Sequence, residues 1–133
     1  MADIARGPEA GPLIVRLLYV LLVYLLAPFI VLHDAWQAAR DPAYRGRLGQ
    51  RLGFAPRPAR TGGLWIHAVS VGEVQAAAGL IRALQQKHPA LPIVITTTTP
   101  TGAQRARALY ADTVHHCYLP YDLPGAVRRF LDR

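Results

Sequence analysis

The chain has 133 residues, of which 52% are hydrophobic, and a formal net charge of +7. This length allows one folded domain with an appendage, and the basic balance points to an anionic partner, either a membrane surface or nucleic acid. The single cysteine, Cys117, excludes an intrachain disulfide and a zinc-binding cysteine cluster, and it favours a reducing compartment.

The N-terminal part of the chain predicts a membrane anchor. Residues 1–12 combine small residues, Gly, Pro and mixed charge, and we expect them to be disordered. Residues 13–32 are apolar except for Arg16, and about 20 such residues suffice for a helix to cross a bilayer. Pro28 would kink that helix or mark its last turn. A buried core helix and a signal peptide are the alternatives, but a signal peptide usually has a shorter apolar core. We therefore predict one transmembrane helix.

The arginines around this span predict its orientation. Arg6 lies ahead of the span and Arg16 near its start, and both are offset by Asp3 and Glu9, whereas the arginines that follow it are more numerous: Arg40, Arg45, Arg47, Arg51, Arg57 and Arg60. Because positive residues favour the cytoplasmic side, the globular part is expected in the cytoplasm.

Residues 33–62 form a basic juxtamembrane segment and linker. Arg45, Arg47 and Arg51 alternate there with glycine and apolar residues. Two interpretations stay open. The segment is a solvated linker, attracted to anionic lipid by about 1 kcal/mol per arginine, or its arginines bind the phosphates of a lipid substrate, since the guanidinium fork matches phosphate geometry.

Residues 63–133 predict an α/β domain. Apolar, β-branched runs alternate with helical patterns, and the connections are short. The pattern predicts a βαβαβα order with a parallel, three-stranded sheet, its first strand buried on both faces. The expected strands start near Leu64, Ile93 and Thr113. Thr99 and Asp122 are expected to cap the second and third helices.

Glu73 is the candidate catalytic residue. It follows the first strand through the small turn Ser70-Val71-Gly72 and stands in the first turn of a helix. There a carboxylate can simply complement the helix dipole, worth about 0.3–1 kcal/mol. It can also act as a general base, because ligands of open α/β sheets bind at the carboxyl ends of the strands. Thr99 and Thr101 could bind an anion through their hydroxyl groups and the amides at the helix terminus, although helix capping explains the presence of these threonines equally well.

Other kinds of site are disfavoured. Gly72 lacks partner glycines at the spacing of a dinucleotide fingerprint, and there is no phosphate-loop lysine pattern. His115 and His116 are neighbours on a strand, so their side chains leave on opposite faces and do not share a metal. His67 and Cys117 are expected to pack in the interior.

Four ordered segments resemble bacterial 3-deoxy-D-manno-octulosonic acid (Kdo) transferases. They are the strand and loop 64–74, the threonine-rich loop 96–102, the Tyr-Leu-Pro-Tyr-Asp segment within 118–124 and the basic segment 45–54. The resemblance implies the N-terminal, Rossmann-like half of a GT-B glycosyltransferase, preceded by one transmembrane helix. It covers the chain from the anchor to Arg133.

Such an enzyme transfers Kdo from CMP-Kdo to the lipid A precursor, lipid IVA, in lipopolysaccharide biosynthesis. It works at the cytoplasmic face of the cell inner membrane, inverts the anomeric configuration, and uses no metal or other cofactor. The resemblance makes Glu73 the general base. The residues proposed to bind substrate are Ser70, Gly72, Arg45, Arg47, Arg51, Thr99 and Thr101.

The family's second acidic motif and its CMP-binding C-terminal domain would lie beyond Arg133, so the chain alone is expected to be inactive. A membrane-tethered, non-catalytic module that binds anionic lipid is the alternative function. A nucleic-acid binder, suggested by charge alone, is disfavoured by the apolar span and by the lack of a basic-aromatic stacking surface.

Overall fold

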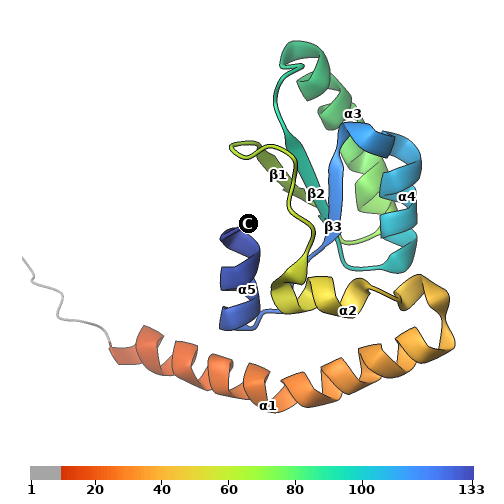
Figure 1. Cartoon of the computed structure of the whole chain (residues 1–133). Coiled ribbons are helices and arrows are strands. Elements are labelled where there is room, and N and C mark those ends of the chain that lie inside the picture. The colour runs from red at the N-terminus through yellow and green to blue at the C-terminus, as the bar shows by residue number, and fades with distance from the viewer. Residues whose placement is uncertain (1–9) are drawn as a thin grey trace, which may run out of the picture.

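The computed structural model describes residues 10–133, so the disorder predicted for residues 1–12 lies mostly outside the described part, and residues 10–12 belong to a helix instead. The chain begins with a long helix, α1 (Ala10–Arg40), which starts before the predicted span and ends after it. Within the described residues, Leu13–Arg40 is the segment that is long and apolar enough to cross a membrane, by length and composition alone. Figure 1 shows that α1 is bent, and the proline inside it, Pro28, is the usual cause of such a bend.

Short helical turns follow α1: η1 (Pro42–Tyr44), α2 (Arg47–Gly49) and η2 (Gln50–Phe54). The Asp41 side chain begins the first of them by accepting a hydrogen bond from the Ala43 amide at 2.8 Å. Gly46 and Gly53 have φ values of 76° and 91°, which let the chain change direction between turns. The basic segment packs against the domain, since the Tyr121 amide donates to the Arg51 carbonyl at 2.7 Å and the Arg129 side chain donates to the Leu52 carbonyl.

The domain has a three-stranded parallel sheet in the order β1-β2-β3, which confirms the predicted α/β class. The strands are β1 (Leu64–His67), β2 (Ile93–Thr97) and β3 (His115–Tyr118). The third strand begins two residues later than predicted, because a turn of 3₁₀ helix, η3 (Ala111–Thr113), precedes it. The remaining helices are α3 (Val71–Lys87), α4 (Pro100–Tyr110) and α5 (Pro124–Leu131).

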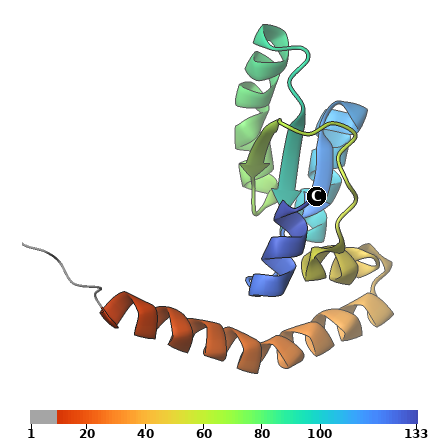
Figure 2. The ribbon, with the colours of Figure 1, turned by 60° about the vertical axis from the view of Figure 1, so that its left-hand side comes forward.

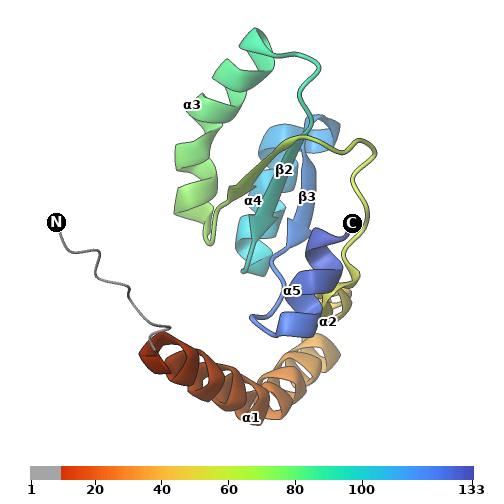
Figure 3. The same ribbon diagram turned by 90° about the vertical axis from the view of Figure 1, so that its left-hand side faces the viewer.

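The core lies between the sheet and the helices α3 and α4. Val74, Ile81, Ile95 and Ala106 are at most 1% exposed. The buried hydroxyl of Tyr110 donates to the Val74 carbonyl at 2.8 Å and ties α4 to α3. The helix α5 packs on the other face, where the Phe130 and Trp65 rings are 5.3 Å apart. Figure 3 shows α3 and α5 on opposite sides of the sheet.

Three expectations were wrong. His67 was expected to pack in the interior, but it is exposed. The strand β1 was expected to be buried on both faces, but Leu64 is 37% exposed and Trp65 is 47% exposed. The reason is that β1 is an edge strand, paired with β2 alone among the described strands. Asp122 does not cap α5: the N-cap position is Leu123, without a side-chain cap, and the Asp122 carboxylate accepts a hydrogen bond from the Tyr19 hydroxyl of α1.

The helix α1 runs across the end of the domain at which the strands terminate. In Figure 2 the strands point down towards it, with α5 and the short turns between. The carboxyl edge of the sheet, where α/β domains place ligands, therefore faces α1.

Candidate functional site at the carboxyl edge

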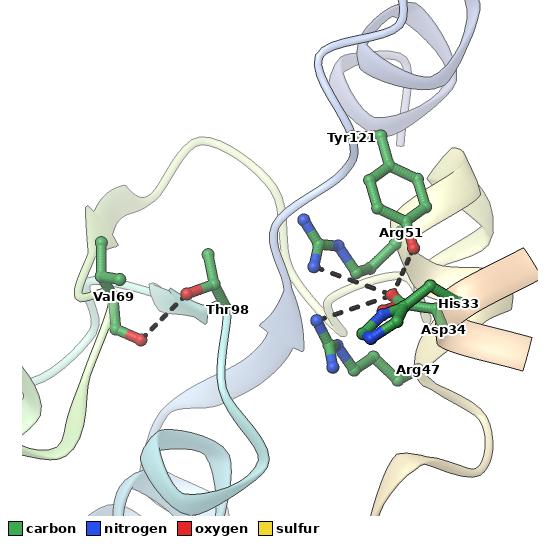
Figure 4. Close-up of polar contacts among 7 residues, drawn as sticks. All are labelled: His33, Asp34, Arg47, Arg51, Val69, Thr98 and Tyr121. Atoms are coloured by element: carbon green, nitrogen blue, oxygen red, sulfur yellow. Dashed lines mark hydrogen bonds and ion pairs between the residues drawn. The ribbon is translucent and has the colours of Figure 1, made fainter. Parts of the chain in front are cut away.

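Two loops at the carboxyl edge are tied together through one carbonyl group. The Val69 carbonyl, directly after β1, accepts hydrogen bonds from the Thr98 amide at 3.3 Å and from the Thr98 hydroxyl at 3.2 Å (Figure 4). The Thr99 hydroxyl approaches the same oxygen at 3.4 Å. The loop that precedes α3 and the loop that precedes α4 therefore form one surface.

Glu73 lies on this surface and is exposed to solvent. Its Oε2 atom accepts a hydrogen bond from the Val69 amide at 2.9 Å, and the Ser70 hydroxyl approaches Oε1 at 3.5 Å. Ser70 itself makes no capping bond to α3, so the carboxylate occupies the place of a cap near the positive helix end. These contacts fix the orientation of Glu73 and leave further acceptor positions open to solvent.

The turn beside Glu73 has room for a ligand. A Cβ atom placed on Gly72 would meet no atom closer than the Ser70 hydroxyl at 4.0 Å. Gly72 is exposed and Ser70 is half-buried. A ligand therefore has room to approach the backbone beside the exposed Glu73 carboxylate.

A cavity of about 720 Å³ lies beside this surface, between the end of α1 and the start of α4. Its wall includes Arg47, Arg107 and the α4 residues around Thr99 and Thr101, whereas Glu73 is not part of that wall. The predicted cap of α4 is confirmed, since the Thr99 hydroxyl accepts from the Gly102 amide at 3.1 Å. The wall combines two guanidinium groups and the N-terminus of α4, which suit an anion, with the carboxylates of Asp34 and Asp41. Asp34 already pairs with Arg47, so Arg107 and the helix N-terminus are the groups left for an anionic ligand.

A buried cluster joins α1 to the basic segment. The Asp34 carboxylate lies 3.6 Å from an Arg47 nitrogen and 3.9 Å from an Arg51 nitrogen, and it accepts a hydrogen bond from the Tyr121 hydroxyl (Figure 4). Burial and the bond to Asp34 raise the pKa of Tyr121, and burial lowers the pKa of Arg51. The Nε atoms of both arginines are buried without a hydrogen-bond partner.

The predicted site residues therefore fall into four places. Arg47, Thr99 and Thr101 share the cavity wall. Ser70, Gly72 and Glu73 lie on the adjoining loop. Arg51 lies in the Asp34 cluster, and Arg45 is exposed on the surface. Asp34 and Tyr121 were missed, because no spacing in the sequence pairs residues that far apart.

The histidines and the cysteine contact protein groups. His115 Nε2 lies 3.1 Å from the Pro56 carbonyl oxygen, and His116 Nε2 lies 3.0 Å from the Thr97 hydroxyl. Burial, with Arg107 nearby, lowers the pKa of His116 to about 4. Burial raises the pKa of the Cys117 thiol to about 11, and the predicted burial of this residue is confirmed. In residues 10–133 no three His, Cys, Asp or Glu side chains gather in a metal-binding arrangement.

The class of protein follows from comparison with known families. A family model described as 3-deoxy-D-manno-octulosonic-acid transferase (kdotransferase) matches residues 46–133, which include both loops of the site. These transferases are glycosyltransferases. The chain belongs to the Kdo transferase family.

Curated relatives agree with this assignment. The chain is 43% identical to the 3-deoxy-D-manno-octulosonic acid transferase of Haemophilus influenzae, over 88% of its own length and 28% of the relative. It is 39% identical to that of Bordetella pertussis, over 89% of the chain and 29% of the relative. A probable mitochondrial transferase of Arabidopsis thaliana is 36% identical, over 86% of the chain and 26% of the relative. The chain thus spans under a third of each relative. No solved structure shows significant similarity to it.

Proposed function

We propose that the chain is the acceptor-side, Rossmann-like part of an inverting GT-B glycosyltransferase. The whole enzyme transfers Kdo from CMP-Kdo to the lipid A precursor, lipid IVA, in lipopolysaccharide biosynthesis. The family match over residues 46–133 and the parallel sheet with its open carboxyl edge support this proposal.

Glu73 is the proposed general base. The observation that supports this role is an exposed carboxylate held at the carboxyl edge by the Val69 amide, next to an open turn. As the acceptor hydroxyl oxygen attacks the anomeric carbon of Kdo, Glu73 takes the hydroxyl proton. The bond between that carbon and the CMP phosphate oxygen breaks, and CMP leaves with the electron pair.

The neighbouring residues bind the acceptor in this proposal. Ser70 and Gly72 border the reacting sugar. Arg47 in the cavity wall, together with Thr99 and Thr101 at the start of α4, binds an anionic group of the lipid. Exposed Arg45 adds positive charge outside the cavity. Arg51 holds the basic segment in place through its ion pair with Asp34.

The protein is proposed to act at the cytoplasmic face of the cell inner membrane. The apolar helix α1 attaches it, and the arginines that follow the helix favour the cytoplasmic side. The sequence predicts a single pass for this helix. CMP-Kdo is bound mostly by the part of the enzyme that lies outside this chain, and neither a metal nor another cofactor takes part.

A non-catalytic module that binds anionic lipid is the second candidate function. The hydrogen bond from the Val69 amide to Glu73 supports this alternative, because a glutamate that only caps the start of α3 would make the same bond. Glu73 would then have a structural role and no catalytic one. The two functions differ in whether the carboxylate has to be ionised and basic.

The experiment is Glu73→Gln in a protein that continues into the donor-binding domain, with Asp112→Asn, an exposed acid at the far end of α4, as the matched control. We expect Glu73→Gln to lower kcat by about 10²–10⁴-fold while membrane attachment and folding persist. A kcat for Kdo transfer within a few-fold of that of the parent enzyme would exclude Glu73 as the base. The 133-residue chain incubated with CMP-Kdo and lipid IVA is expected to give no product.

A further inference from the structure

His67 is the last residue of β1 and lies at the carboxyl edge, immediately before the loop that leads to Glu73. Side chains alternate between the two faces of a strand, and the neighbouring Ile66 and Ala68 belong to the core under α3 and α4. His67 therefore lies on the opposite face of the sheet, which is the face of α5. There Phe130 of α5 packs on Trp65, whereas the His67 side chain is exposed.

A buried hydroxyl holds the imidazole ring of His67 in place. Thr96 is 0% exposed, and its hydroxyl accepts a hydrogen bond from the indole nitrogen of Trp65 at 2.9 Å. His67 Nδ1 lies 3.0 Å from this hydroxyl and 3.2 Å from the Thr96 carbonyl oxygen. The buried hydroxyl proton needs an acceptor, and among residues 10–133 the one within reach is Nδ1 of the neutral ring. In the charged ring, Nδ1 donates to the Thr96 carbonyl. Nε2 therefore carries a hydrogen in both states.

The outward nitrogen of His67 distinguishes it from the other histidines on the sheet. Nε2 of His115 lies 3.1 Å from the Pro56 carbonyl oxygen, and Nε2 of His116 lies 3.0 Å from the Thr97 hydroxyl. In the part of the chain that the structure describes, His67 bonds through Nδ1 alone. A fixed donor with no protein acceptor thus points to solvent at the edge where α/β domains bind ligands.

His67 is also the one side chain of the carboxyl-edge loops that can carry a positive charge. The loops 67–73, 96–102 and 118–124 contain neither lysine nor arginine. Arg47 and Arg51 of the basic segment share the buried Asp34 carboxylate. An anion that approaches Glu73 from solvent would therefore depend on His67 for a cationic partner within these loops.

The donor of the proposed reaction brings such an anion to Glu73. Kdo is a 2-keto sugar acid, so its carboxylate is bonded directly to the anomeric carbon that is attacked. With the acceptor oxygen about 3 Å from Glu73 and about 3.5 Å from that carbon, the Kdo carboxylate lies within about 8 Å of the Glu73 carboxylate. Two negative charges at that separation repel each other.

His67 is close enough to contact this carboxylate. The Val69 amide donates to Glu73 Oε2 at 2.9 Å, and standard backbone dimensions then place Oε2 within about 9 Å of the His67 Cα atom. The imidazole extends from that Cα atom into solvent. A sugar that reacts beside Glu73 therefore has its carboxylate within reach of His67.

We propose that His67 is a donor-binding residue, whose Nε2–H group donates a hydrogen bond to the carboxylate of Kdo in CMP-Kdo. This contact offsets the repulsion between that carboxylate and Glu73. Thr96 and Trp65 act through His67 as positioning residues, because they fix its ring. The proposal rests on the proposed function, since it takes CMP-Kdo as the donor.

The test compares His67→Asn with His67→Gln in a protein that continues into the donor-binding domain. The Asn amide oxygen takes the place of Nδ1 and still accepts from Thr96, but nothing replaces Nε2. The Gln amide nitrogen takes the place of Nε2 and loses the bond to Thr96. Binding of CMP-Kdo and of CMP is measured by calorimetry without lipid IVA, so no transfer occurs and the role of Glu73 as a base is not involved.

We expect His67→Asn to weaken the binding of CMP-Kdo by about 10-fold or more, because a hydrogen bond to a charged group is lost. Its affinity for CMP, which lacks the Kdo carboxylate, should stay unchanged. His67→Gln should bind CMP-Kdo within a few-fold of the parent protein. His115→Asn is the matched control, since the strand register puts His115 on the same face at the other end of the sheet, and it should change neither affinity.

Three results would overturn the proposal. They are an unchanged affinity of His67→Asn for CMP-Kdo, an equal loss of affinity for CMP and CMP-Kdo, and a larger loss in His67→Gln than in His67→Asn. The last result is what a purely structural bond to Thr96 predicts. A parent protein that does not bind CMP-Kdo would overturn the proposed function itself, so the two failures are distinguishable.

Discussion

Gly53 occupies a position that no other residue fits. Its φ of 91° is in the left-handed region, and a Cβ atom would lie 2.4 Å from the Ala126 carbonyl oxygen, which belongs to α5. We expect Gly53→Ala to lower the free energy of unfolding by about 2–4 kcal/mol. Gly49→Ala is the control, since Gly49 is helical with no atom within 4 Å, and should raise stability by about 0.4–1 kcal/mol. Denaturant unfolding in detergent micelles measures both, and equal effects would contradict the packing of η2 on α5.

Because of His116, the free energy of unfolding should fall as the pH is lowered. Burial is the main cause that lowers its folded pKa from 6.5 to about 4. Between these values the unfolded chain binds a proton that the folded chain does not, so stability is lost as the pH falls from 6.5 towards 4. Because the ring is partly exposed, we expect this contribution to be about 2 kcal/mol, less than the full linkage value. His116→Gln removes the titration, and an unchanged pH slope in that variant would show that His116 is not its source.

At the residue scale, local sequence patterns were enough to predict the role of some residues. Thr99 with Pro100 predicts a helix start from adjacent residues, and the cap has the expected partner. Asp122 offers a similar local signal, yet its carboxylate accepts the hydroxyl of Tyr19, 103 residues earlier in the chain. The position of Glu73 in a first helical turn was predictable, but its bond to the Val69 amide depends on how the loop closes.

The periodicity of apolar residues predicted the helices and strands themselves, but it did not predict what packs against each of them. Alternating apolar runs predicted three parallel strands, because each run is short and each connection is filled by a helix. The exposure of β1 depends on whether another strand pairs with its edge, which a single segment does not encode. The turns at 42–54 were missed because glycine and arginine in alternation have no helical period.

The Asp34 cluster gives a prediction at the scale of elements. Asp34→Asn leaves Arg47 and Arg51 without their shared counter-charge in a buried site, where breaking an ion pair typically costs about 3–5 kcal/mol. We expect the end of α1 to separate from α2 and η2. Hydrogen exchange of the amides in 47–54 should therefore accelerate by about 100-fold or more.

Asp132→Asn is the matched control for this prediction. It removes an exposed pair with Arg128 at 3.7 Å, worth about 0.3–0.5 kcal/mol, and should leave exchange in 47–54 unchanged. Similar exchange in both variants would mean that Asp34 does not hold α1 to the basic segment.

At the scale of the whole molecule, the long helix, the cavity and the two loops of the site are brought together by contacts that are distant in sequence. Composition predicts an apolar helix and a basic surface, and periodicity predicts the domain. Neither predicts that the helix lies along the carboxyl edge, because that placement depends on Tyr19, Asp34 and their partners beyond residue 46.

That placement can be tested in the membrane by cross-linking. Tyr19→Cys with Asp122→Cys, joined by a short bifunctional maleimide, should cross-link efficiently in vesicles, because the two side chains meet in the docked arrangement. A reagent with a spacer is needed, since a tyrosine side chain bridges more space than a disulfide does. Leu18→Cys with Asp122→Cys is the control: Leu18 is 60% exposed, it makes no contact with Asp122, and the pair should react poorly. If α1 instead leaves the domain to cross the bilayer, Asp122 stays at the surface while residue 19 enters the hydrocarbon, and both pairs fail alike. Efficient linkage of the Tyr19 pair alone therefore distinguishes a helix lying beneath the site from one that only tethers the domain to the membrane.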